Sequence, residues 1–151
     1  MFPLRDSQPS GSLAIVTYLI IAINVVVFLF EISLGDHGLE VFLKNFGLVP
    51  LLFFQQFGPY EIFTLFSCMF LHGGWMHLIS NCLWFVVFGT VVARRLSPLR
   101  FLAVCAAGAI GGAAAMLLVY WGQDVILVGA SGSVSALMAA ARAAQPPPMM
   151  A

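Results

Sequence analysis

The 151-residue sequence is 62% hydrophobic and only 8% charged. Soluble domains usually carry about 25% charged and about 45–50% apolar residues, so this composition excludes an ordinary soluble domain, and it equally excludes an intrinsically disordered chain. The length suits one domain. Six basic side chains balance six acidic ones, which leaves no basic surface of the kind that binds nucleic acid.

Uncharged stretches indicate membrane-spanning helices. Asp, Glu, Lys and Arg are all missing from residues 7–30, 62–93, 101–123 and 125–141. A bilayer core of about 30 Å needs about 20 apolar residues, so the first three stretches are long enough to span it and the fourth is at the lower limit. We therefore predict an all-α polytopic membrane protein with four helices, at about 13–34, 69–92, 99–121 and 127–144.

The first predicted helix is expected to be a permanent anchor. Its apolar stretch is too long for a cleaved signal peptide, and no small-residue cleavage motif follows it. The cations favour a cytoplasmic N-terminus, because five of them share one side if the helices alternate, and only Lys44 lies on the other. Those five are Arg5, Arg94, Arg95, Arg100 and Arg142. We predict an integral, multi-pass protein, in the inner membrane if the source is bacterial, with the 35–68 connection outside.

The 35–68 connection is expected to lie at the membrane surface. An amphipathic helix is predicted by the i, i+3, i+4, i+7 spacing of Leu39, Phe42, Leu43 and Phe46. The apolar segment 48–54 is interrupted by Pro50 and is too short to span. The whole 35–68 connection should lie on or partly in the outer leaflet, or pack as a hydrophobic hairpin on the helix ends.

Polar side chains interrupt the second predicted span. His77 and Asn81 are four residues apart and therefore share one helix face, and His72 lies nearer the outer end. Polar groups at membrane depth usually face a protein interior or a wet cavity. An interhelical hydrogen bond that only holds the bundle together would also explain them. A metal site is disfavoured, because only two intramembrane histidines are present and no carboxylate accompanies them.

Small residues and thiols carry less information. Gly108 and Gly112 in the third predicted span form a small-xxx-small face that allows close helix packing in lipid. Cys68, Cys82 and Cys105 show neither paired spacing nor a metal-ligand pattern, so we expect free thiols.

The fourth predicted helix opens with a serine between glycines, in the sequence Gly129-Ala-Ser131-Gly132. Glycines leave backbone N–H groups accessible, and a helix N-terminus favours the negative charge that develops during acyl transfer. Small-residue packing, extended by Ser135 and Ala136, is the alternative explanation. A serine on one helix facing the His77 and Asn81 donors on another would be an acyl-transfer arrangement.

Four segments together resemble the rhomboid intramembrane serine proteases, in order and spacing, over roughly residues 13–141. They are Phe70-Leu-His-Gly-Gly-Trp-Met-His-Leu-Ile-Ser-Asn81, Phe88-Gly89, Arg100-Phe-Leu102 and Gly129-Ala-Ser-Gly132. The resemblance implies a bundle of six core transmembrane helices around a water-filled cavity open to the outside, of which this sequence would supply four. It also implies substrates that are transmembrane segments of membrane proteins, and no metal or organic cofactor.

The resemblance assigns roles to individual residues. Ser131 matches the catalytic serine, with Gly129 and Gly132 beside it. His77 and Asn81 match residues that stabilise the oxyanion together with the Ser131 backbone N–H. His72 matches a histidine that supports the first loop and the cavity.

The sequence also departs from the family pattern. Ala93 stands where a glutamate is usual, and the 35–68 connection has no Trp-Arg pair. The family's general base is a histidine on the sixth helix. The Pro-rich residues 143–151 cannot form another span, so residues 1–142 are expected to be a partial rhomboid domain. His37 lies in the outer connection, and no replacement base is evident, so we expect these 151 residues alone to be inactive.

Three functions remain open. They are a rhomboid protease whose base-bearing C-terminal helices are absent from this sequence, a non-catalytic rhomboid-like protein that binds transmembrane clients, and a small structural or transport bundle. The first is favoured, because a binding protein has no need of an aligned nucleophile and oxyanion donors, and two matching motifs argue against the third. Gly132, Ser135 and Ala136 form a small-residue face for which the first three helices offer no obvious partner. In the family that role belongs to the sixth helix.

Overall fold

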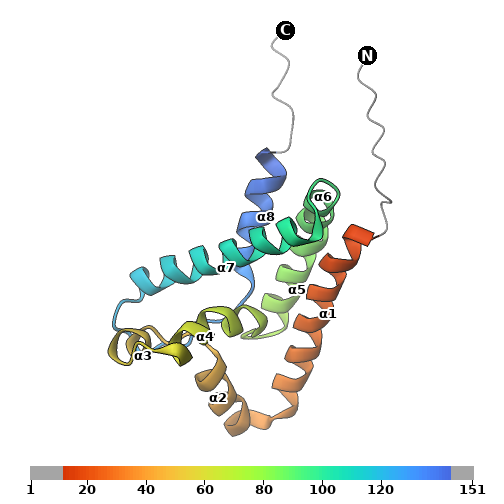
Figure 1. The fold of residues 1–151 in the computed structure, drawn as a ribbon. Coiled ribbons are helices and arrows are strands. Elements are labelled where there is room, and N and C mark those ends of the chain that lie inside the picture. Colours follow the sequence, from red (N-terminus) through yellow and green to blue (C-terminus); the bar gives the residue numbers. More distant parts are fainter. Residues whose placement is uncertain (1–11, 144–151) are drawn as a thin grey trace, which may run out of the picture.

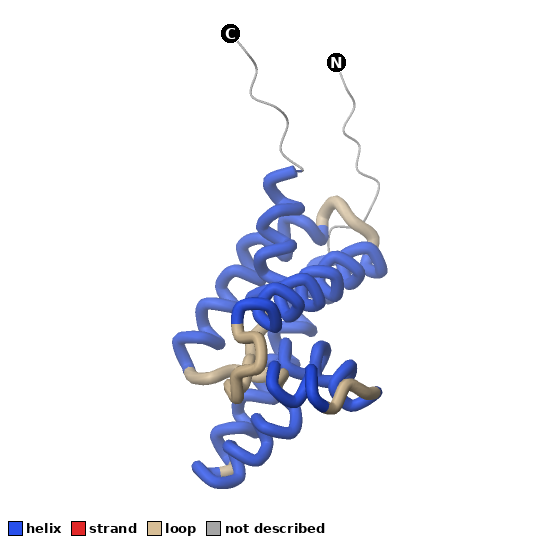
Figure 2. Tube along the Cα trace, turned by 90° about the vertical axis from the view of Figure 1, so that its left-hand side faces the viewer, coloured by secondary structure: helices blue, strands red, loops and turns tan. Residues whose placement is uncertain are grey.

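The computed structural model describes residues 12–143, and their regular secondary structure is entirely helical (Figures 1 and 2). Within residues 12–143, three helical segments are long and apolar enough to cross a membrane, namely Ile15–Ser33, Trp75–Ala93 and Pro98–Val119. This confirms the predicted all-α membrane bundle. The fourth predicted span, α8 (Ser131–Ala143), has 13 residues in the described part and is not among the three. The remainder of the predicted tail and Arg5 lie outside the described residues.

Two of the predicted helices have nearly the predicted bounds. α1 covers Ser12–Ser33 and α7 covers Pro98–Val119. The span at 75–93 is a continuous helix made of α5 (Trp75–Trp84), a π-helical segment (Phe85–Gly89) and α6 (Thr90–Ala93). α7 crosses the other long helices at a steep angle, while α5 runs alongside α1 (Figure 1).

The predicted starts of the second and fourth spans, at 69 and 127, were wrong by several residues. α5 begins at Trp75, after a 3₁₀ turn at Cys68–Phe70 and an extended segment, and α8 begins at Ser131. The reason is backbone conformation. Gly74 has φ +154° and Gly129 has φ +118°, and neither value is compatible with a right-handed helix. His72 and Gly129 therefore lie on connecting segments rather than inside helices.

The 35–68 connection is almost wholly helical. α2 (Gly35–Phe46) confirms the predicted amphipathic helix. α3 (Pro50–Gln55) and α4 (Pro59–Ser67) follow, and each has its proline at the first turn, where the missing N–H costs nothing. Pro50 thus starts a helix where the sequence suggested an interruption, and α4 was not predicted. The Ser67 hydroxyl donates to Phe46 O at 2.6 Å and so joins the end of α4 to the end of α2.

α7 and α8 pack backbone against backbone through glycines. A Cβ atom on Gly108 would lie 2.5 Å from Ala136 Cβ and 2.6 Å from Gly132 O, and one on Gly112 would lie 2.8 Å from Gly132 Cα. The Ser133 hydroxyl donates to Cys105 O at 2.7 Å across the same crossing. The expectation that Gly132 and Ala136 lack a partner in the first three spans was therefore wrong, because the small residues of α7 provide one.

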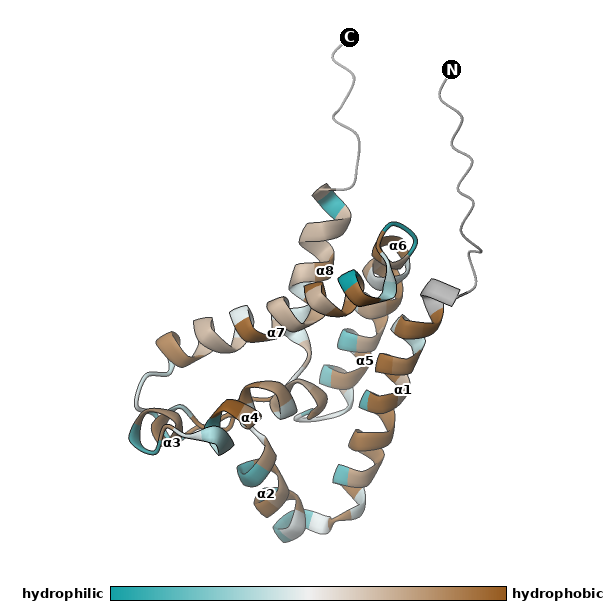
Figure 3. Cartoon of the chain, in the orientation of Figure 1, coloured by the Kyte–Doolittle hydropathy of each residue, from teal (hydrophilic) through white to brown (hydrophobic). Residues whose placement is uncertain are grey.

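The core lies where α1, the 75–93 span, α7 and α8 meet. Ala93, which stands in place of the usual family glutamate, belongs to this apolar cluster and is only 1% exposed. Hydrophobic residues predominate along the long helices (Figure 3), and many of them are exposed, including Met76 at 77% and Leu118 at 70%. Such a surface suits a lipid environment. The buried cluster contains Ile20, Phe85, Val92, Ala93, Phe101, Cys105, Ala130, Val134, Leu137 and Ala141.

Candidate active site

The α5 face that carries His77 and Asn81 meets the segment just before α8. A Cβ atom on Gly129 would lie 2.5 Å from both Cε1 and Nε2 of His77, and 3.7 Å from Asn81 Nδ2. Position 129 therefore requires glycine for two reasons. Its φ is positive, and the His77 imidazole leaves no room for a Cβ atom. This contact brings His77 and Asn81 to the backbone two residues before Ser131.

Asn81 provides an uncommitted donor in this region. Its side chain is 4% exposed, and Nδ2 has no hydrogen-bond partner within the described part of the chain. Buried polar atoms are nearly always paired, and an exception calls for an explanation such as a ligand or a catalytic role. An amide N–H held at this place can donate to a negative oxygen.

The three serines of α8 differ in what their hydroxyl groups do. Ser133 donates to Cys105 O across the helix crossing, and Ser135 donates to Ser131 O at 2.8 Å within α8. The Ser131 hydroxyl makes no hydrogen bond to any described residue, and the Ser131 side chain is exposed. Ser131 also stands at the first position of α8, where backbone N–H groups lack helical partners and favour negative charge.

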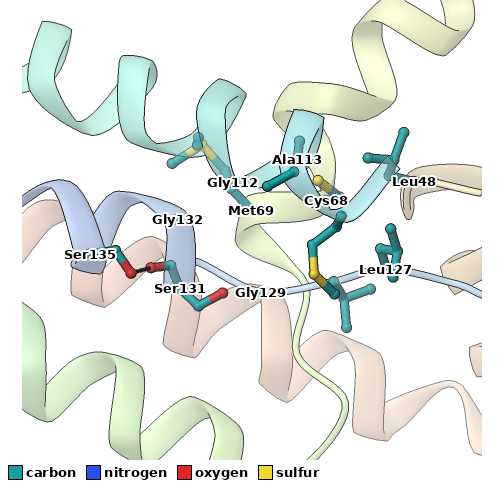
Figure 4. A pocket seen from close by; sticks show the side chains of 14 residues that line it. Leu48, Cys68, Met69, Gly112, Ala113, Leu127, Gly129, Ser131, Gly132 and Ser135 are labelled. Carbon is teal, nitrogen blue, oxygen red and sulfur yellow. Dashed lines mark hydrogen bonds between the residues drawn. The ribbon is translucent and has the colours of Figure 1, made fainter. Parts of the chain in front are cut away.

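Ser131 opens onto a cavity of about 280 Å³. Gly132 and Ser135 of α8 line one side, and Cys68 and Met69 line another (Figure 4). His77 and Asn81 are not among the lining residues, although Gly129, which they approach, is. The structure therefore brings the predicted donors to the backbone before the serine, and places the serine side chain against a separate, mostly apolar hollow. The remaining lining residues are Leu48, Ala109, Gly112, Ala113, Ala115, Met116, Leu127, Val128 and Gly129.

Backbone hydrogen bonds hold the segment that precedes Ser131. Leu48 and Leu127 exchange two hydrogen bonds, of 3.0 and 2.8 Å, in an antiparallel bridge. Gly129 N donates to Cys68 O at 2.8 Å. The 35–68 connection thus packs onto the segment before α8, although it does so as the helices α2, α3 and α4 rather than as a hairpin.

His72 is buried behind His77. It is 2% exposed, its ring lies edge-on to the His77 ring with centroids 5.3 Å apart, and its Nδ1 lies 3.3 Å from Phe70 O. Burial, and then the nearby His77, lower the pKa of His72 to about 4, so its ring is neutral at physiological pH. Its Nε2 has no hydrogen-bond partner among the described residues.

A carboxyl group accompanies these histidines, contrary to the prediction from the sequence. Both carboxyl oxygens of Glu31, near the end of α1, lie 3.3 Å from His72 N, which donates to them. The only signal in the sequence was an acidic residue within the predicted span 13–34. Residues 12–143 contain no cluster of three or more His, Cys, Asp or Glu side chains that could hold a metal ion.

Comparison with known proteins gives one family. A search of curated proteins found no match. The Rhomboid domain profile matches residues 59–147, which is more than half of the chain. The matched range includes His72, His77, Asn81, Gly129 and Ser131. The chain belongs to the rhomboid family.

Proposed function

We propose that the protein is an intramembrane serine endopeptidase that cleaves transmembrane segments of membrane proteins. Membership of the rhomboid family supports this at the level of the family. The observation that carries the proposal is the contact between Gly129 and the His77 ring. It brings two side-chain donors to the backbone two residues before Ser131, whose hydroxyl is not hydrogen-bonded to any described residue.

In this mechanism Ser131 is the nucleophile. Its Oγ attacks the scissile carbonyl carbon, and the carbonyl π electrons move to the oxygen, which becomes an oxyanion. His77, Asn81 Nδ2 and the Ser131 backbone N–H donate to that oxyanion. Support comes from the unpaired Asn81 Nδ2 and from the position of Ser131 at the α8 N-terminus. No metal or organic cofactor takes part.

The general base is the one role that the described residues leave unassigned. A neutral His72 with its Nδ1 directed at Phe70 O and its pKa lowered to about 4 is a poor proton acceptor at neutral pH. His77 is assigned to the oxyanion. We propose, from the family resemblance, that a histidine on a further helix takes the Ser131 proton and returns it to the leaving amine.

The proposed orientation places the N-terminus in the cytoplasm. Arg94, Arg95 and Arg142 belong to the end of the bundle where α6, the start of α7 and the end of α8 gather, and Lys44 belongs to α2 at the opposite end (Figure 1). In a background without native cysteines, a cysteine at Asp36 should react with a membrane-impermeant thiol reagent in intact cells, and one at Ser97 should not. The reverse pattern would overturn the orientation.

The test of the proposed function is cleavage of a transmembrane reporter by the chain co-expressed with the fifth and sixth helices of a close homologue. Ser131→Ala should abolish cleavage. Ser135→Ala is the matched control, because Ser135 is on the same helix, lines the same cavity and donates its hydroxyl only to a main-chain oxygen, Ser131 O. Cleavage that survives in Ser131→Ala would contradict the assignment. Reporter binding without cleavage in the wild-type protein would favour a client-binding role instead.

A further inference from the structure

Glu31 is a buried group that the proposed chemistry does not use. It is 1% exposed although it lies within an apolar span, and the described residues supply no ion pair for it. Burying a carboxyl group is costly unless it is hydrogen-bonded. Its partner is the main-chain amide of His72, 41 positions further along the chain and outside any helix.

The same face of α1 makes a second contact a few residues away. Phe28 is three positions before Glu31 and 3% exposed, and its ring lies edge-on to that of Trp75, with centroids 4.9 Å apart. Trp75 is the first residue of α5. α1 thus contacts the chain on both sides of Gly73 and Gly74, the two glycines that separate His72 from α5.

These two contacts hold the part of the chain that leads to His77. The His72 ring contacts the His77 ring, and His77 in turn contacts Gly129 beside Ser131. A shift at His72 or at the start of α5 would move His77 relative to Ser131. A change of about 1 Å at a catalytic group can cost about a hundredfold in rate.

We propose that Glu31 is a positioning residue of the active site, which acts through the His72 main-chain amide to set the start of α5 and the place of His77. The inference rests on the proposed function, since it assigns Glu31 to the same site. If Glu31 acts in this way, the position of His77 depends on whether the side-chain oxygen of residue 31 extends far enough to accept from His72 N. It does not depend on the negative charge of the carboxylate.

Two variants of Glu31 separate the effect of side-chain length from the effect of charge. Glu31→Asp keeps the carboxyl group but withdraws its oxygens from His72 by one methylene, whereas Glu31→Gln keeps the length and one acceptor oxygen. Asn24→Leu is the matched control, because Asn24 is 1% exposed on the same helix and its Oδ1 has no hydrogen-bond partner among the described residues. Phe28→Leu tests the second contact without touching a polar group.

The first measurement does not depend on activity. Amide hydrogen exchange of the 151-residue protein in lipid nanodiscs should become about tenfold faster over residues 71–78 in Glu31→Asp, the size expected when a buried hydrogen bond is lost. Glu31→Gln and Asn24→Leu should match the wild-type protein there, and residues 133–141 of α8 should be unchanged in all variants. Phe28→Leu should speed exchange over residues 75–78. Equal exchange in Glu31→Asp and the wild-type protein, or an equal increase in Asn24→Leu, would overturn the proposal.

The second measurement is reporter cleavage in the co-expression assay. Glu31→Asp should lower kcat with little change in KM, and Glu31→Gln should retain both. Full kcat in Glu31→Asp would contradict the positioning role. A wild-type protein that cleaves nothing would count against the proposed endopeptidase, and the exchange measurement would still decide whether Glu31 holds His72.

Discussion

Two regions of the bundle hold buried polar groups in opposite ways. At the α7–α8 crossing, Ser133 is fully buried and its hydroxyl is paired with Cys105 O at 2.7 Å. On the α5 side, Asn81 is almost as buried, but its Nδ2 is unpaired. The first region satisfies its polar atoms and brings backbones into contact, which is what helix packing in lipid requires. The second leaves a donor available, which is what a reaction centre requires, so two residues of similar burial differ in whether their polar atoms can take part in a reaction.

The largest effect is expected from a side chain at the close crossing. Gly132→Val should prevent stable folding, because a Cβ atom there would overlap Gly108 O. Overpacking a tight contact costs about 1–3 kcal/mol or more, and here the backbone of α7 would have to move. Thermal unfolding in detergent measures the change. Gly111→Val is the matched control, since a Cβ atom at Gly111 meets nothing within 4 Å, and equal losses in both variants would contradict the crossing.

Substitutions of the two buried polar residues, Asn81 and Ser133, should have opposite effects on activity and stability. Asn81→Ala should lower cleavage in the co-expression assay by about 10²–10³-fold, the usual cost of losing one oxyanion donor. It should leave the unfolding temperature nearly unchanged, because no described partner is lost. Ser133→Ala should do the reverse, costing about 1 kcal/mol of stability with little direct effect on the reaction. A loss of stability without loss of rate in Asn81→Ala would remove Asn81 from the site.

A substitution of Gly129 tests whether the backbone conformation at this position contributes to activity. Gly129→Ala should lower cleavage by about 10–100-fold, since a strained φ costs about 1–3 kcal/mol and the new methyl group would also displace the His77 ring. Gly122→Ala provides the comparison, because Gly122 has φ +66° with nothing within 4 Å of a Cβ atom. The same loss of activity in both variants would attribute the effect to backbone strain alone.

The smallest effect concerns pH. The pKa of His72 is lowered from 6.5 to about 4, so between these values the unfolded chain binds more protons than the folded one. The stability that a neutral His72 contributes is complete above about pH 6.5 and is lost as pH falls to about 4. His72→Gln should reduce the drop in unfolding temperature between pH 7 and pH 5. An unchanged drop in this variant would show that other groups dominate it.

Hydropathy correctly predicted the two helices, α1 and α7, whose bounds depend only on the length of apolar sequence needed to span a bilayer. α1 and α7 agree with the predicted helices at 13–34 and 99–121 within two residues, since the bilayer dictates the length of a span. The starts of α5 and α8 were missed, because they depend on the dihedral angles of Gly74 and Gly129. α4 was missed because prolines that begin a helix also resemble prolines that interrupt one.

Some residues of the candidate site could likewise be located from the sequence, and others could not. His77 and Asn81 could be placed on one face from their spacing, and Ser131 at a helix start from its flanking glycines. Glu31 could not be placed, because its partner is 41 residues away and is a main-chain group without a side-chain signal. The partner of Gly132 was assigned wrongly, since small residues on several helices are equally suited to close packing and only the tertiary structure decides among them.

The bridge between Leu48 and Leu127 also has a consequence for synthesis. Its two halves are separated by two long apolar helical segments, so the intervening chain must be inserted before the bridge can close. Until then the segment before Ser131 lacks the hydrogen bonds that fix it. The serine therefore gains its defined setting only when both intervening helices are in the bilayer, and reactivity would develop only as assembly is completed.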